Sequence, residues 1–173
     1  MTTTHFTILS RVLHWLMAAL ILAMLFIGVA MVSSLSDYSR LVSIHKPIGA
    51  LLLVLVALRL INRLLHPAPP LPAGMPAVLR FAAHASHWLL YALMIALPLI
   101  GWGMLSAGGY PIDLVGSFHL PPILPHSSAL YAVLRPAHTV AAYLLFATFL
   151  VHLGAALAHA FIFRDGVFES MTH

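Results

Sequence analysis

The stretch HTVAAYLLFATFLVH, residues 138–152, decides the fold and also carries the most informative spacing in the chain. It has no charged residue and lies within an apolar run from about Ala137 to Phe163. A run of this length exceeds the ~20 residues that a helix needs to cross a ~30 Å hydrocarbon layer. His138 and His152 are 14 residues apart, nearly four turns at about 3.6 residues per turn. Both side chains therefore project from one helix face, about 21 Å apart along the axis.

Three more apolar runs follow the same pattern, at about Val12–Val32, Leu41–Leu65 and His84–Ala107. Hydrophobic residues make up 62% of the 173 residues and charged residues 7%, which leaves too little charge to cover a water-facing surface and excludes a soluble globular protein. Inside lipid each backbone N–H must be satisfied within its own segment, so helices are expected. The sequence predicts an all-α membrane protein, one domain over residues 1–173, built as an antiparallel bundle of four transmembrane helices in the lipid bilayer.

The segments between the runs set the direction in which the chain crosses the membrane. Five prolines in the run from His66 through Pro76 predict an extended connector, and a loop is expected from Gly108 to Pro136. In this topology five cations lie on the side of the termini and three on the other, which favours both termini in the cytoplasm. The cations are scattered singly and form no basic arm, so no nucleic-acid partner is expected. The cations on the side of the termini are Arg11, Arg59, Arg63, Arg80 and Arg164. Those on the other side are Arg40, Lys46 and Arg135.

Histidine dominates the groups able to bind a cofactor. The chain has 12 histidines, four carboxylates and no cysteine, which excludes disulfides, iron–sulfur clusters and covalently attached c-type haem. His45 is expected at the depth of His138, and His14 at the depth of His152, so facing helices offer two imidazole pairs. Because bis-histidine pairs hold haem b without covalent bonds, the sequence predicts two haem b groups stacked across the membrane.

Other roles for membrane histidines stay open at this point. A single imidazole inside a bundle is often an interhelical hydrogen-bond partner, and a set of imidazoles also suits a transporter or a proton channel. Zinc or non-haem iron is less favoured, because such sites usually include Cys, Asp or Glu and the apolar runs contain no carboxylate.

Candidate substrate sites lie at both ends of the expected electron path. On the outer side Arg135 either pairs with a haem propionate or helps to attract a small anion. On the inner side His87, Trp88 and His159 are candidates for contact with a quinone headgroup, because an imidazole can donate a hydrogen bond and a proton near neutral pH. The alternative for the two histidines is hydrogen bonding to one another or to the backbone.

Four motifs resemble the short bacterial cytochrome b561 family, and the likeness covers nearly the whole chain. These motifs are Ser10–Leu16, Ile44–Gly49, Ala83–Tyr91 with Ala96–Gly101, and His138 through His152 to His159. The resemblance implies a multi-pass protein of the bacterial inner membrane that passes electrons from periplasmic superoxide through two b haems to ubiquinone. The alternative function is a cytochrome b electron-transfer subunit that anchors and serves a dehydrogenase or hydrogenase partner.

The same resemblance assigns the candidate site residues. It implies that His45 and His138 are the iron ligands of the periplasmic haem. It implies in the same way that His14 and His152 bind the cytoplasmic haem. It implies that the quinone site is formed by His87, Trp88 and His159. For the superoxide side it implies Arg135.

Overall fold

Four long helices form a bundle in the computed structural model, which describes residues 5–72, 74–116 and 118–172. They are α1 (Ile8–Ser33), α2 (Tyr38–Leu65), α3 (Ala77–Ala107) and α4 (Ser128–Ala158), and a π-helical turn, η1 (His159–Phe163), continues α4. All four are long and apolar enough to cross a membrane. The predicted four-helix membrane fold is therefore confirmed.

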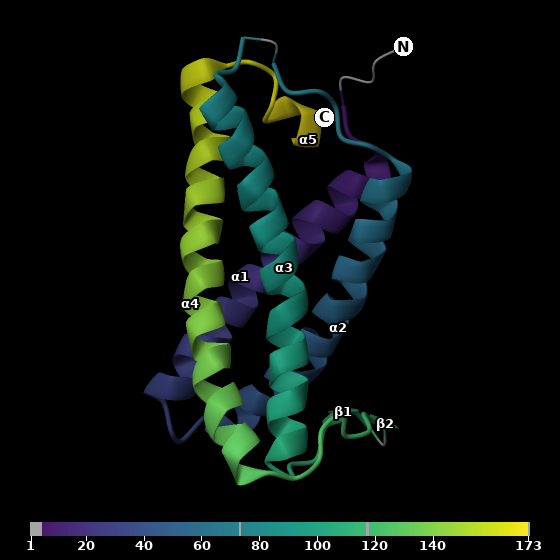
Figure 1. Cartoon of the computed structure of the whole chain (residues 1–173), viewed down its shortest axis with the longest axis vertical. Coiled ribbons are helices and arrows are strands. Elements are labelled where there is room, and N and C mark those ends of the chain that lie inside the picture. The colour runs from purple at the N-terminus through teal and green to yellow at the C-terminus, as the bar shows by residue number, and fades with distance from the viewer. Residues whose placement is uncertain (1–4, 73, 117, 173) are drawn as a thin grey trace.

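The helices pack as two pairs. α1 runs along α2, α3 runs along α4, and α2 also contacts α3. Figure 1 shows α1 crossing obliquely behind α3, whereas α3 and α4 run more nearly parallel to the long axis of the molecule. The two pairs thus enclose an interior to which all four helices contribute side chains.

All four helices begin earlier than the apolar runs indicate, α1 at Ile8 and α2 at Tyr38 by three or four residues, and α3 and α4 by more. α3 begins at Ala77 rather than at about His84, and α4 begins at Ser128 rather than at about Ala137. The prediction that the outer loop extends to Pro136 is wrong, because this proline lies inside α4. Prolines are tolerated within membrane helices, and an apolar run marks only the part of a helix that lies in hydrocarbon.

Local hydrogen bonds explain where α1 and α4 start. The Thr7 side chain accepts a hydrogen bond from the backbone N–H of Ser10, and the Ser127 side chain accepts one from that of Leu130. Each hydroxyl satisfies one of the N–H groups that a first helical turn leaves without a partner.

A short hairpin in the segment between α3 and α4 adds strand structure to the helical fold. Its strands are β1 (Asp113–Val115) and β2 (Phe118–His119), and they pair antiparallel. Gly116 has a φ of 59° at the turn, a conformation that favours glycine. Lys46 Nζ donates a hydrogen bond of 2.9 Å to the Pro111 carbonyl, which ties this segment to α2. We call this end of the bundle the hairpin end.

The two ends of the described chain meet at the opposite end of the bundle, which we call the terminal end. A short helix, α5 (Glu169–Thr172), folds back from η1 beside the N-terminal part of α1 (Figure 1). The Phe6 backbone N–H donates to the Ser170 carbonyl at 3.0 Å, and Trp15 Nε1 donates to the Met171 carbonyl at 3.2 Å. The first and last described residues therefore lie at one end of the bundle, as four membrane crossings require.

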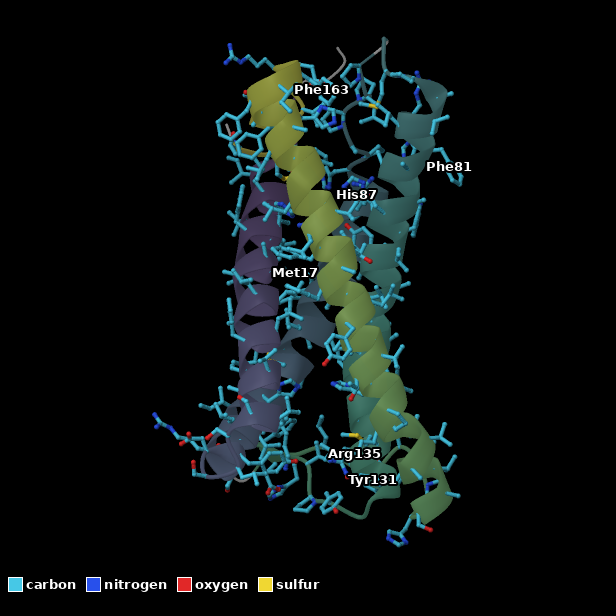
Figure 2. All side chains as sticks on the ribbon, turned by 90° about the vertical axis from the view of Figure 1, so that its left-hand side faces the viewer. Met17, Phe81, His87, Tyr131, Arg135 and Phe163 are labelled. Carbon is cyan, nitrogen blue, oxygen red and sulfur yellow. The ribbon has the colours of Figure 1, made fainter. Side chains whose placement is uncertain are left out.

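The core lies between the four long helices. Val56 is completely buried and Met17 is 2% exposed, and Figure 2 shows Met17 in the interior. Large apolar side chains also cover the outside; Phe81 is 73% exposed and projects outward from α3 (Figure 2). An exterior of this kind suits contact with lipid rather than water. The buried core residues are Leu13, Met17 and Ile21 of α1, Leu52, Leu55 and Val56 of α2, Tyr91 and Leu93 of α3, and Leu145 of α4.

Candidate functional site

Three histidine rings gather in the half of the bundle nearest the terminal end. His14 of α1 and His152 of α4 have ring centroids 6.2 Å apart, with ring planes at 76°. The ring centroid of His87 on α3 lies 5.3 Å from that of His152, and the His87 side chain points into the bundle (Figure 2). The apolar pattern predicts His87 at the opening of its helix. It lies ten residues into α3 instead, because that helix begins at Ala77.

Two further histidine rings face one another nearer the hairpin end. The ring centroids of His45 on α2 and His138 on α4 are 6.3 Å apart. Within the described residues, Nδ1 of each ring is buried and has no hydrogen-bond partner. A Cβ atom built on Gly101 of α3 would lie 3.3 Å from Cε1 of His138. The absence of a side chain at this glycine therefore leaves the room that the imidazole occupies.

The spacing of both pairs fits one metal ion between two imidazoles. A ring nitrogen binds such an ion at about 2.0 Å and lies about 1.2 Å from its ring centre, so two coaxial rings have centroids about 6.4 Å apart. The pairs His14–His152 and His45–His138 match this separation at 6.2 and 6.3 Å. The 5.3 Å between His87 and His152 is too short for the same arrangement.

Sites with three or more protein ligands are not favoured by this arrangement. Over the part of the chain that the structure describes, no group of three or more His, Asp or Glu side chains is placed to hold a metal ion. Two facing imidazoles would instead hold the iron of a haem, a metal that takes histidine ligands in cytochromes. The residues present thus fit haem b better than zinc or non-haem iron.

A hydrogen-bonded polar group that the sequence did not reveal lies beside the three-histidine cluster. Arg59 of α2 donates from Nε to the Tyr91 hydroxyl at 3.2 Å and from a terminal nitrogen to the Ser10 carbonyl at 3.4 Å. Asn62 Nδ2 donates to Ser10 Oγ at 2.7 Å. In the sequence, Arg59 stands out only as a cation near the membrane surface. The sequence does hold one sign of this group: Ser10 is four residues from His14, and Tyr91 is four residues from His87, so each lies on the same helix face as a histidine of the cluster.

The candidate quinone residues do not form one contact group. Nδ1 of His159 lies 2.8 Å from an Asp165 carboxylate oxygen, and its ring packs on Phe163 rather than on His87. Arg164, which has a φ of 50°, reverses the chain after η1 and brings Asp165 back to His159. Trp88 is 60% exposed on the outside of α3.

Arg135, the candidate residue for the outer side of the membrane, also lies at the surface. Arg135 is exposed and lies on α4, three residues before His138, in the part of α4 nearest the hairpin end (Figure 2). The structure thus places a cation within one turn of a histidine that faces another imidazole.

A four-helix membrane bundle with facing imidazole pairs at two depths has the architecture of a membrane cytochrome of the b type. The family described as prokaryotic cytochrome b561 matches residues 5–173, and the chain belongs to this family. Membership implies haem b binding, electron transport and oxidoreductase chemistry in a membrane.

Two cytochrome b561 homologues and a probable superoxide oxidase are similar to this chain. Cytochrome b561 homolog 2 of Escherichia coli (strain K12) is 32% identical over 174 residues, which cover 98% of this chain and 92% of that protein. The probable superoxide oxidase CybB of Yersinia pestis is 32% identical over 133 residues, or 74% of this chain and 72% of that protein. Cytochrome b561 homolog 1 of Escherichia coli (strain K12) is 29% identical over 136 residues, or 79% and 77%.

Proposed function

We propose that this protein is a superoxide:ubiquinone oxidoreductase of the bacterial inner membrane, with two b haems and both termini in the cytoplasm. The observation that carries the proposal is the pair of imidazole–imidazole separations, 6.2 and 6.3 Å, at two depths of one bundle. The similarity to a probable superoxide oxidase supports the choice of electron donor. The five-to-three distribution of cations supports the orientation.

Four histidines are the proposed iron ligands. His14 and His152 would hold the haem nearer the terminal end, and His45 and His138 the haem nearer the hairpin end. The haems supply one-electron transfer between ferric and ferrous iron. With two protein imidazoles holding each iron, the electron donor and acceptor would bind outside the iron coordination.

The hairpin end is the proposed superoxide side. Arg135 is exposed there, and Lys46 follows directly after the proposed ligand His45. Positive side chains around a low-dielectric surface raise the local concentration of a small anion. Arg135 and Lys46 therefore attract superoxide to the end where the electron enters.

The terminal end is the proposed ubiquinone side. The Asp165 carboxylate lies on Nδ1 of His159. In the imidazolium form of the ring, Nδ1–H would donate to this carboxylate, and Nε2–H would supply a proton to a quinone carbonyl. His87 lies beside His152. Of the histidines on α3, it is the one nearest to the haem that His14 and His152 would hold. The exposed indole of Trp88 offers a flat apolar surface for the quinone ring on the lipid side. Two superoxide ions give two electrons, and with two protons these convert ubiquinone to ubiquinol and leave two molecules of oxygen.

The test is rapid mixing of the purified protein with superoxide, followed by haem absorbance and by ubiquinol formation. We expect fast haem reduction and one ubiquinol for every two superoxide ions. If two haems are present but superoxide does not reduce them, the proposed reaction is wrong. The electron-transfer subunit for a protein redox partner would then be the better account.

The haem sites are tested by single ligand substitutions. His152→Ala should remove the haem nearer the terminal end and keep the other, and His138→Ala should do the reverse. Haem content and reduced-minus-oxidised spectra measure this. Equal loss of both haems from each variant, in chains that keep their helix content, would contradict the two-depth assignment.

The quinone site is tested by His159→Ala with His84→Ala as a matched control. His84 is an exposed histidine of α3 towards the same end. Loss of a proton donor slows a reaction by about 10²- to 10⁴-fold, so His159→Ala should slow ubiquinol formation while both haems remain. The His84 variant should turn over at the wild-type rate. Equal rates in both variants would remove His159 from the site.

A further inference from the structure

Arg59 is half-buried, and hydrogen bonds tie its guanidinium to two neighbouring helices. It donates to the Tyr91 hydroxyl at 3.2 Å and to the Ser10 carbonyl at 3.4 Å, so it joins α2 to α3 and α1. Tyr91 is 6% exposed, Ser10 9% and Asn62 6%. The Asn62 amide also donates to Ser10 Oγ at 2.7 Å. Hydrogen bonds to buried partners hold the charge in one place.

This fixed charge lies next to the three-histidine cluster. Ser10 precedes His14 by four residues on α1, and Tyr91 follows His87 by four residues on α3. Each partner of the guanidinium is thus one helical turn from a clustered histidine and on the same helix face.

The charge acts electrostatically on the rings of the cluster. Its partners Ser10 and Tyr91 place it beside His14 and His87, whose ring centroids lie 6.2 and 5.3 Å from that of His152, and Coulomb energies are large at such short range.

For the other pair, His45 and His138, the cations nearest in sequence are Lys46 and Arg135, which lie at the surface. Lys46 bonds to the Pro111 carbonyl at an exposed position, and Arg135 is exposed. Water and salt screen surface charges more than a charge held between helices. The two proposed haem sites therefore differ in charge environment.

The difference bears on reduction because an arginine side chain stays charged at any pH that a protein tolerates. Reduction of ferric to ferrous iron removes one positive charge from the haem. A fixed cation beside the haem destabilises the ferric state more than the ferrous state, and a low dielectric strengthens this effect.

We propose that Arg59 raises the reduction potential of the haem held by His14 and His152 above that of the haem held by His45 and His138. The proposal rests on the two-haem function proposed above. It makes the step between the haems favourable towards the terminal end, where the proposed quinone site lies. An electron that enters at the hairpin end is therefore drawn across the membrane by a charge built into α2.

The experiment is a redox titration of the full-length protein, followed by visible spectra. We expect two midpoint potentials, of which the higher belongs to the haem that remains in the His138→Ala variant. Arg59→Gln should lower that midpoint by at least the equivalent of a tenfold change in the reduction equilibrium, about 59 mV for one electron. The other midpoint should stay unchanged. Arg59→Lys, which keeps the charge, should shift the higher midpoint by less than half as much.

Two more variants make the test specific. Arg80→Gln removes an arginine from the first turns of α3, where it donates to the Met75 carbonyl, and should leave both midpoints unchanged. Asn62→Asp keeps the size of the side chain, places a carboxylate beside Arg59, and lets Ser10 Oγ donate instead of accept. It should lower the same midpoint as Arg59→Gln, and it decides the matter if the Arg59→Gln chain does not fold.

The outcomes separate the two proposals. Fewer than two haems in the wild-type protein would overturn the proposed function. Two haems whose midpoints do not respond to Arg59→Gln, or to Asn62→Asp, would overturn only the role of Arg59. An equal fall of both midpoints, or the same fall in Arg80→Gln, would also overturn it.

Discussion

Replacing Gly101 with leucine should empty the haem site at the hairpin end and leave the other site filled. A Cβ on this residue would lie 3.3 Å from Cε1 and 3.6 Å from Nδ1 of His138. Alanine alone therefore pushes the imidazole by a few tenths of an ångström. Leucine adds three more carbon atoms in the space that the ring occupies.

The size of the effect follows from the cost of overpacking. Extra carbon atoms in a packed interior cost about 1–3 kcal/mol, and each 1.4 kcal/mol is about a tenfold change in affinity. Haem affinity at the His45–His138 site should thus fall by about 5-fold to about 140-fold. We expect Gly101→Ala near the lower value and Gly101→Leu at or beyond the upper one.

The assay is the haem-to-protein ratio, with reduced-minus-oxidised spectra compared with those of His138→Ala. Gly154→Leu is the matched control, because Gly154 lies two residues after His152 and a Cβ atom on it would have nothing within 4 Å. This control should keep both haems. A Gly101→Leu protein that binds two haems, or that loses both while its helix content is unchanged, would refute the reasoning.

Three further predictions concern the contacts around the sites. Asn62→Ala removes the donor to the buried Ser10 hydroxyl and should destabilise the protein by about 1–3 kcal/mol, measured as a lower thermal midpoint; an unchanged midpoint would contradict the role of this bond. Lys46→Met removes the bond from α2 to the Pro111 carbonyl and should speed amide hydrogen exchange in residues 108–116 without loss of haem, whereas unaltered exchange would count against the anchor. Asp165→Asn should slow ubiquinone reduction by about tenfold, since a hydrogen bond to a charged group contributes about 1.5 kcal/mol, and wild-type turnover would show that this carboxylate is not needed.

The four helices could be predicted from the sequence because hydrocarbon thickness sets the length of an apolar run. The helix starts could not be predicted in the same way. The first turns of α3 and α4 carry Arg80 and Arg135, which break the apolar pattern, and a serine hydroxyl rather than hydropathy marks the start of α4. The small hairpin was missed because strands of two and three residues leave no periodic signal.

The candidate site was predictable along each helix but not around it. The 14-residue spacing of His138 and His152 fixes their common face, because helix geometry is the same in any context. The approach of His87 to His152, and the contact of Arg59 with Tyr91, depend on how three helices are rotated against one another. Residue spacing along the sequence does not give the rotation of one helix against another. From the sequence, Arg59 therefore counts only as one of the cations that set the orientation in the membrane.

The order in which the chain is made has a consequence for when a cofactor can be captured. Each facing pair joins a histidine from α1 or α2 to one from α4, so neither pair exists until the last helix has entered the bilayer. The bond from Trp15 to Met171, which spans 156 residues, closes later still. Biogenesis is thus ordered by the architecture: a truncated translation product lacking α4 offers porphyrin no complete cradle, and free haem cannot be trapped in a half-inserted chain.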